Sequence, residues 1–157
     1  MKKFKLTSEF IVDISGVKLF RIKALIEFGN VKAGDLGGYI EKEENLSHMG
    51  DAWVSDDARI SGNAQVFGNA QVFGDAQVFG DAWVSGDKDY AYAHGFGSCN
   101  RTTTFFRLKD GDVGVRCGCF YGTLAQFRDK VCETHGETKK AQEYLMLADL
   151  MEIRFKN

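Results

Sequence analysis

The residues best suited to bind a ligand in this chain are cations and rings that lie close together in sequence. Arginine can donate to two oxygens of a phosphate at once, and an aromatic ring can stack on a base. The sequence therefore predicts a site for an anionic small molecule or a nucleotide. Its ligand-binding candidates are Arg101, Arg107, Lys109, Arg116, Tyr90, Tyr92, His94 and Phe96. The alternative is a solvated strand face that pairs with acidic residues elsewhere.

Residue types for catalysis are sparse. The chain has three histidines, His48, His94 and His135, and His94 is the best-placed base if the protein transfers an acyl group. The sequence contains no phosphate-binding loop, dinucleotide fingerprint, nucleophile elbow or metalloprotease motif. We therefore predict no catalytic residues and no cofactor.

Four cysteines, Cys99, Cys117, Cys119 and Cys132, raise the question of a metal site. Zinc sites usually show paired C-x2–4-C spacings, and here the only close pair is the C-x-C of Cys117 and Cys119. In a strand both of these side chains would point to the same face, so burial against a helix explains them. We predict no metal site.

The element that must position these residues is a repeat from residue 50 to residue 87, called here the repeat segment. It reads GDAWVS DDARIS GNAQVF GNAQVF GDAQVF GDAWVS GD. Each unit has a turn pair of Gly with Asp or Asn, except that Asp56 takes the place of the glycine in the second unit, and then a short alternating strand. One unit cannot bury its aliphatic residue alone, so units must stack. We expect these stacked pairs: Val54 with Val72, Ile60 with Val78, and Val66 with Val84.

The period of six residues resembles the hexapeptide repeat of left-handed parallel β-helices, in which three units form a coil of about 18 residues. This resemblance implies a mainly β fold: a short left-handed parallel β-helix with an N-terminal β cap and a small C-terminal α+β module. The expected divisions are 1–30 for the cap, 31–88 for the β-helix, 89–104 for a linker and 105–157 for the module.

Within residues 105–157, the run Lys109-Asp110-Gly111-Asp112 predicts a hairpin turn between two strands. Thr123 is a candidate N-cap for a helix that ends at Gly136. A second helix is expected from about Glu137 towards Asp149.

A second resemblance covers most of the chain. The run VKAGDLGGYIEKEENLS followed by GDAWV, together with CGCFYGTLAQF and AQEY, is similar to uncharacterised hexapeptide-repeat proteins of phages and prophages that have a C-terminal CGCF-type α+β module. The resemblance implies a source and a fold, but no settled activity.

Large aromatic side chains on the outside of the repeats predict an interface, because several of them should not all face water. The expected oligomer-interface residues are Phe67, Phe73, Phe79, Trp53 and Trp83. We expect a homotrimer, since hexapeptide β-helices usually associate around a three-fold axis. The alternative is a monomer whose own C-terminal part covers the repeats.

Charge is nearly balanced, with 20 basic and 22 acidic residues, so neither a nucleic acid nor a membrane is an expected partner. No signal peptide or membrane-spanning run is recognisable, which favours a cytoplasmic protein, in the host cytosol if a phage encodes it. We predict a non-enzymatic oligomeric binding protein with a counter-defence role, either sequestering a nucleotide signal or blocking a host protein. The alternatives are a hexapeptide-repeat acyltransferase-like enzyme and a structural scaffold.

Overall fold

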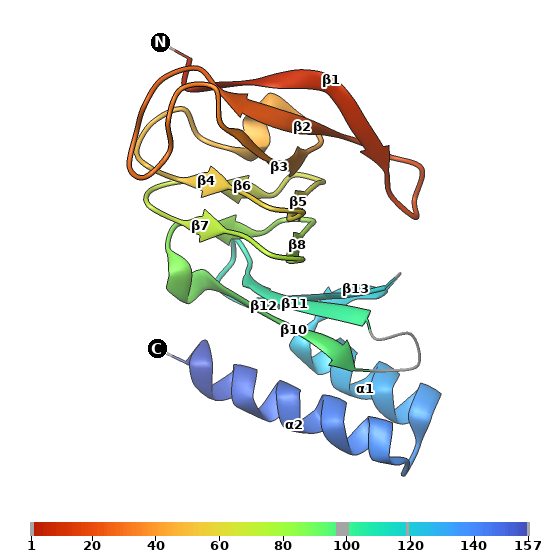
Figure 1. Cartoon of the computed structure of the whole chain (residues 1–157). Coiled ribbons are helices and arrows are strands. Elements are labelled where there is room, and N and C mark those ends of the chain that lie inside the picture. The colour runs from red at the N-terminus through yellow and green to blue at the C-terminus, as the bar shows by residue number, and fades with distance from the viewer. Residues whose placement is uncertain (1, 97–100, 119, 157) are drawn as a thin grey trace.

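A computed structural model describes residues 2–96, 101–118 and 120–156. Figure 1 shows the parts following one another from top to bottom: the N-terminal strands, the repeat segment, a four-stranded sheet and two helices. The N-terminus therefore lies at one end of the molecule, and the helices form the other end.

The N-terminal strands belong to a five-stranded sheet with the order β1-β2-β3-β5-β8. Its first three strands are antiparallel, and β3 then pairs in parallel with β5 of the repeat segment. The bounds are Phe4–Val12 for β1, Lys18–Ala24 for β2 and Leu36–Ile40 for β3, followed by the short 3-10 helix η1 at Glu43–Asn45.

The repeat segment contains six strands of two residues each, and each of the first three pairs in parallel with the strand 18 residues later. They are β4 (Trp53–Val54), β5 (Arg59–Ile60), β6 (Gln65–Val66), β7 (Gln71–Val72), β8 (Gln77–Val78) and β9 (Trp83–Val84). The expected pairs are confirmed: Val54 with Val72, Ile60 with Val78, and Val66 with Val84. All six side chains are fully buried, and burying each one stabilises the fold by about 1.5–3 kcal/mol.

The prediction of a mainly β chain built on a left-handed parallel β-helix is wrong for this protein. The fold is mixed, with four separate sheets of five, four, two and two strands and two helices. The physical reason is that the period-six pattern fixes which side chains face inward only between residues 50 and 87. One of its ladders joins the antiparallel N-terminal strands, and the rest of the chain follows no such period.

Below the repeats, residues 90–156 form the C-terminal unit, which begins with an antiparallel sheet of order β10-β11-β12-β13. A 3-10 helix, η2 (Asp87–Asp89), leads into it. The strands are β10 (Tyr90–Phe96), β11 (Arg101–Arg107), β12 (Val113–Cys117) and β13 (Phe120–Thr123). The prediction of a linker at 89–104 is therefore wrong, because its aromatic residues form β10 and pack on both sides of this sheet.

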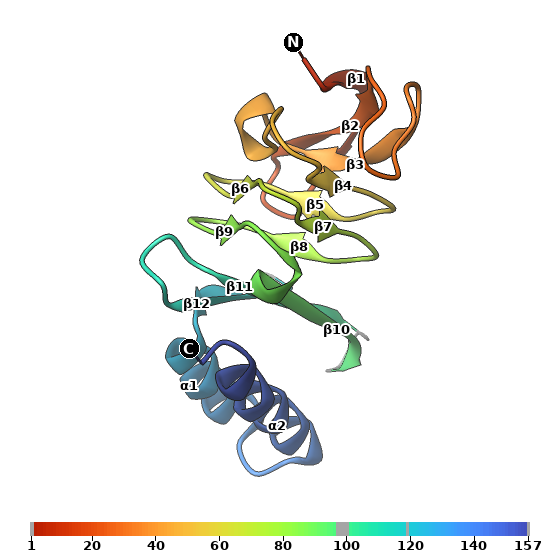
Figure 2. The same cartoon turned by 90° about the vertical axis from the view of Figure 1, so that its left-hand side faces the viewer.

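Both faces of the four-stranded sheet are covered, as Figures 1 and 2 show. Phe106 packs into the core of the repeat segment, while its neighbour Phe105 packs into the core under the helices. The Thr104 hydroxyl accepts a hydrogen bond from the backbone N–H of Gln77, at 2.9 Å. The sheet thus satisfies the otherwise open end of the repeats, where strand edges need a cover.

Two helices, α1 (Leu124–His135) and α2 (Lys139–Arg154), close the lower face. Thr123 caps α1 through a capping box with Gln126, and Gly136 ends the helix with a φ of 59°. The expected start and end of this helix are confirmed. The predicted turn before it is also present, because the Leu108 N–H donates to the Asp112 carbonyl.

Across the described residues, neither helix has both the length and the apolar character that crossing a membrane requires.

Candidate functional site

The four-stranded sheet divides the predicted ligand residues between its two faces. Tyr90, Tyr92 and Arg116 lie on the face towards the repeats. The Tyr90 hydroxyl donates to the Gln71 carbonyl at 2.6 Å, and burial raises the pKa of Tyr90 to about 12. Arg116 lies 4.1 Å above the ring of Phe79. These residues hold the sheet to the repeats.

Arg101, Arg107 and Phe96 lie on the opposite face, towards the helices. Arg107 contacts Asp89 at 3.3 Å and donates to the carbonyl of Phe155, so it joins the strand to the end of α2. Phe96 packs against the core under the helices. Arg101 lines an open pocket.

Lys109 and His94 lie at the margins of the sheet. The Lys109 ammonium lies 5.4 Å from the ring centre of Trp83. His94 is exposed, and its Nδ1 lies 2.8 Å from the Thr102 hydroxyl. The eight predicted residues therefore do not form one site.

The pocket beside Arg101, called here the basic pocket, has a volume of about 310 Å³. Strands β11–β13 supply one wall, and α1 and α2 supply the other. Its basic side chains are Arg101, Lys130 and His135, and none of its lining side chains is a carboxylate. The complete lining is Arg101, Cys117, Phe120, Phe127, Lys130, Val131, Thr134, His135 and Tyr144.

A chain of hydrogen bonds forms the deep side of the basic pocket. The Thr103 hydroxyl donates to Cys117 Sγ at 3.2 Å, and the Cys117 thiol donates to the Tyr144 hydroxyl at 3.7 Å. Burial, followed by the neighbouring Cys117, raises the pKa of Tyr144 well above its usual value. Tyr144 therefore stays a neutral hydroxyl, which can donate to an acceptor group of a ligand.

Aromatic rings give the basic pocket an apolar surface. Phe127 meets Tyr144 edge-on, with ring centres 5.6 Å apart, and His135 stacks on Tyr144 at 5.8 Å. A cavity that combines apolar walls with a few converging polar groups is the usual form of a small-molecule site. This arrangement suits a ligand with a ring and a negative charge.

Sequence reasoning missed the partners of Arg101, namely Lys130, His135 and Tyr144. Phe127, Val131 and His135 recur every four residues along α1, which is a helical spacing visible in the sequence. That signal predicts a shared face, but it does not predict which strand the face packs against.

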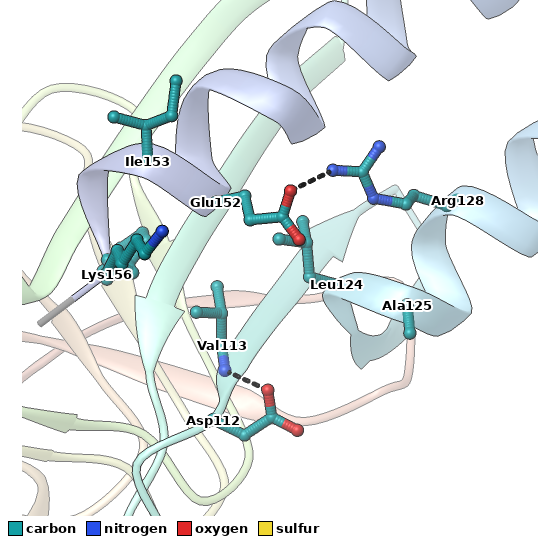
Figure 3. Close-up of a pocket in the computed structure, with 9 residues that line it drawn as sticks. Asp112, Val113, Leu124, Ala125, Arg128, Glu152, Ile153 and Lys156 are labelled. Carbon is teal, nitrogen blue, oxygen red and sulfur yellow. Dashed lines mark hydrogen bonds and ion pairs between the residues drawn. The ribbon is translucent and has the colours of Figure 1, made fainter.

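A larger hollow lies at the other end of the helices and has a volume of about 640 Å³. Figure 3 shows Arg128 paired with Glu152 at its edge, and Arg128 also contacts Asp149 at 2.6 Å. Because carboxylates already neutralise its arginine, this hollow is less suited to an anion than the basic pocket.

The predicted oligomer-interface residues have different environments. Trp53 is 4% exposed and lies against Phe28. Phe79 is half-buried beneath Tyr121 and Arg116. Both are therefore covered by their own chain.

The remaining three interface candidates stay accessible. Trp83 is 39% exposed and Phe73 is 47% exposed. Phe67 is half-buried and meets Trp83 edge-on, with ring centres 5.9 Å apart.

His48 and the cysteines do not lie in a cluster that could hold a metal ion within the described part of the chain. His48 stacks on Phe4 and accepts a hydrogen bond from the Lys3 backbone N–H. Cys99 and Cys119 lie outside the described residues, while Cys132 is exposed and free. No cluster of three or more metal-ligating side chains occurs in the part of the chain that the structure describes.

None of the family models searched matches this chain, and no curated protein sequence matches it either.

Proposed function

We propose that this protein is a non-enzymatic binding protein that holds a nucleotide-type anion in the basic pocket. The observation that carries the proposal is the convergence of Arg101, Lys130 and His135 on a cavity without a lining carboxylate. Lys130 has an acidic neighbour, Glu133, only at 3.8 Å on the exposed side of α1. The pocket therefore offers an excess of positive charge.

The rest of the pocket supports a ligand with both a ring and a phosphate. Phe120 and Phe127 offer ring surface, while Arg101 and Lys130 offer charge-assisted donors. Tyr144 adds a neutral hydroxyl beside the apolar wall. A purely inorganic anion would leave this apolar surface unused.

The cellular role that we propose is counter-defence in the cytosol of an infected host. The resemblance of the sequence to phage proteins supports this role, and sequestering a nucleotide signal requires a binding site but no catalytic group. Blocking a host protein is the second form of the same role. Acyl transfer has less support, because His94 is exposed and its Nδ1 lies beside the Thr102 hydroxyl rather than in the basic pocket.

Isothermal titration calorimetry with cyclic dinucleotides, cyclic mononucleotides and ADP-ribose tests the small-ligand proposal. We expect one member to bind, and we expect Arg101→Gln and Lys130→Gln each to weaken binding about tenfold or more, the effect of losing about 1.4 kcal/mol. Lys109→Gln is the matched control, because it removes an exposed cation from the turn between β11 and β12, outside the pocket.

Two results would overturn the proposal. One is a folded protein that binds no member of the panel. The other is a binding nucleotide whose affinity is unchanged in both pocket variants. A loss of affinity in Lys109→Gln alone would place the site beside Trp83 instead.

The assembly that we propose is a homotrimer whose contacts include Phe67, Phe73 and Trp83. The exposure of Phe73 and Trp83 supports it, because large apolar side chains at a surface favour association. Light scattering coupled to size exclusion should give three times the chain mass, and Phe73→Ser with Trp83→Ser should lower it. A monomer mass at every concentration would contradict the trimer, and masses that grow with concentration would support a scaffold.

A further inference from the structure

A small hollow lies where three distant parts of the chain meet. The turn between β1 and β2 reaches down the side of the molecule on which β5 and β8 lie (Figure 1). There it meets the outer surface of the repeats and strand β12. The hollow, called here the hairpin hollow, has a volume of about 90 Å³. It is lined by Asp13, Ile14, Leu19, Arg59, Ser61, Gln77, Phe79, Arg116 and Gly118.

The repeat departs from its own pattern at this hollow. Before the aliphatic residue, three units have Gln and two have Trp, and only Arg59 is charged. After it, three units have Phe and three have Ser, and Ser61 stands directly above Phe79 in the stack. A phenylalanine at 61 would extend into this space. In this unit the small side chain of Ser61 leaves the hollow open, and Arg59 supplies a positive charge beside it.

Two guanidinium groups line the hairpin hollow from different elements. Arg59 comes from β5, and its guanidinium makes no ion pair within the described part of the chain. Arg116 comes from β12, is 6% exposed and is held over the ring of Phe79. Ser61 and Gln77 add neutral donors. Guanidinium donors match the oxygens of phosphate and sulfate.

One carboxylate faces these cations. Asp13 Oδ1 accepts hydrogen bonds from the backbone N–H groups of Ser15 and Val17, which fixes it in the turn. The lining therefore contains two guanidinium groups and one carboxylate. Asp13 would compete with an incoming anion for the arginines, and its charge would therefore lower the affinity for the anion.

We propose that the hairpin hollow is a binding site for a tetrahedral oxyanion, held between Arg59 and Arg116. The ion is inorganic phosphate or sulfate, or the phosphoryl group of a larger molecule, since the chemistry of recognition is the same. The site is separate from the basic pocket, because it lies on the opposite face of the four-stranded sheet.

Calorimetric titration of the whole chain in a phosphate-free buffer tests this proposal, with inorganic phosphate, sulfate and AMP as separate probes. We expect phosphate to bind and Arg59→Gln to weaken binding about tenfold or more. That variant should fold normally, because glutamine occupies the equivalent position of three other units. Ser61→Phe should abolish binding by filling the hollow, and Asp13→Asn should tighten binding several-fold.

The probes distinguish the sources of the anion. Binding of phosphate and sulfate without AMP indicates a free ion, while tighter binding of AMP that Arg59→Gln abolishes indicates a phosphoryl group. Binding that Arg101→Gln weakens and Arg59→Gln leaves unchanged assigns the anion to the basic pocket and overturns the hairpin site. A folded chain that binds none of the three probes at millimolar concentration also overturns it.

Discussion

The repeat segment and the C-terminal unit bury different kinds of apolar side chain. In the repeats every interior position is Ala, Val or Ile at a fixed spacing, and each backbone ladder joins residues 18 apart. In the C-terminal unit the interior is made of rings such as Phe105, Phe127 and Tyr144 from separate elements. A regular interior leaves little room for a cavity, whereas rings that meet edge-on leave the basic pocket between them.

The comparison teaches where binding chemistry can arise in this molecule. A hollow on the repeats occurs where one unit breaks the pattern with Arg59 and has the small Ser61 after its aliphatic residue. A hollow in the C-terminal unit occurs where strands β11–β13 and the two helices do not close over Arg101. In both places a β-strand positions the arginine, β5 for Arg59 and β11 for Arg101. The space beside each arginine lies where that strand meets a different part of the fold.

The largest effect should come from placing a charge inside the repeats. Val72→Asp would bury an unpaired carboxylate, and we expect it to lower the free energy of unfolding by more than about 4 kcal/mol. Urea denaturation followed by circular dichroism measures the change. Gln65→Asp, at an exposed position of the same segment, should cost less than about 1 kcal/mol. Equal losses in the two variants would show that the interior is not packed as described.

The next effect tests the junction between the two regions. Gly80 has a φ of 69°, and the Tyr121 hydroxyl occupies the space that a Cβ would need. Gly80→Ala should destabilise the protein by about 2–3 kcal/mol, from backbone strain and from displacing Tyr121.

Gly86→Ala is the matched control for this junction. Gly86 has a φ of −164° and no atom near its Cβ position, so its thermal midpoint should change little. A neutral Gly80→Ala would mean that the sheet is not seated on the repeats.

A smaller effect concerns the upper end of the repeats, where Lys3 is 1% exposed. Its ammonium donates to the Ala52 carbonyl at 2.6 Å, and burial lowers the pKa of Lys3 to about 8. Between that pH and about 10.5 the unfolded chain binds more protons than the folded chain. The free energy of unfolding should therefore rise with pH, by about 1–2 kcal/mol between pH 7.5 and 9.5.

Urea titrations across that pH range measure the effect of Lys3, and Lys3→Met should remove the rise. Lys2→Met, which alters an exposed neighbour paired with Glu43, should keep it. The range stops at pH 9.5 because the pKa of Tyr90 is raised in the folded chain. At higher pH this group lowers the free energy of unfolding as the pH rises, which would oppose the effect of Lys3. A slope that survives in Lys3→Met would assign it to another group.

The smallest effect concerns Asp56, which occupies the place of a repeat glycine with a φ of 55°. Asp56→Gly would relieve strain, but it would lose the hydrogen bond that Asp56 Oδ2 accepts from the Gly74 N–H. We expect these to cancel to within about 0.5 kcal/mol. A loss above 1 kcal/mol in chemical denaturation would show that the carboxylate holds this corner.

Much of the local structure could be predicted because its causes are local. Thr123 and Gly136 mark the ends of α1 through capping and a positive φ, and Gly111 marks the hairpin turn. The assignment of β10 as a linker failed because its residues gain their strand from pairing with β11. The basic pocket was only partly predictable, since Arg101 stands out by charge while Lys130 and Tyr144 become its neighbours only after the helices pack.

The sequence by itself determined the interior of the repeats, because a spacing of six residues places Val54 and Val72 on one side wherever the chain turns at each Gly-Asp or Gly-Asn pair. Only the tertiary structure decided that β3 extends the β5–β8 ladder, that the four-stranded sheet closes the lower end, and which cations share a hollow. These contacts join segments with no common period, so their free energy depends on shape and packing that no single stretch of sequence contains.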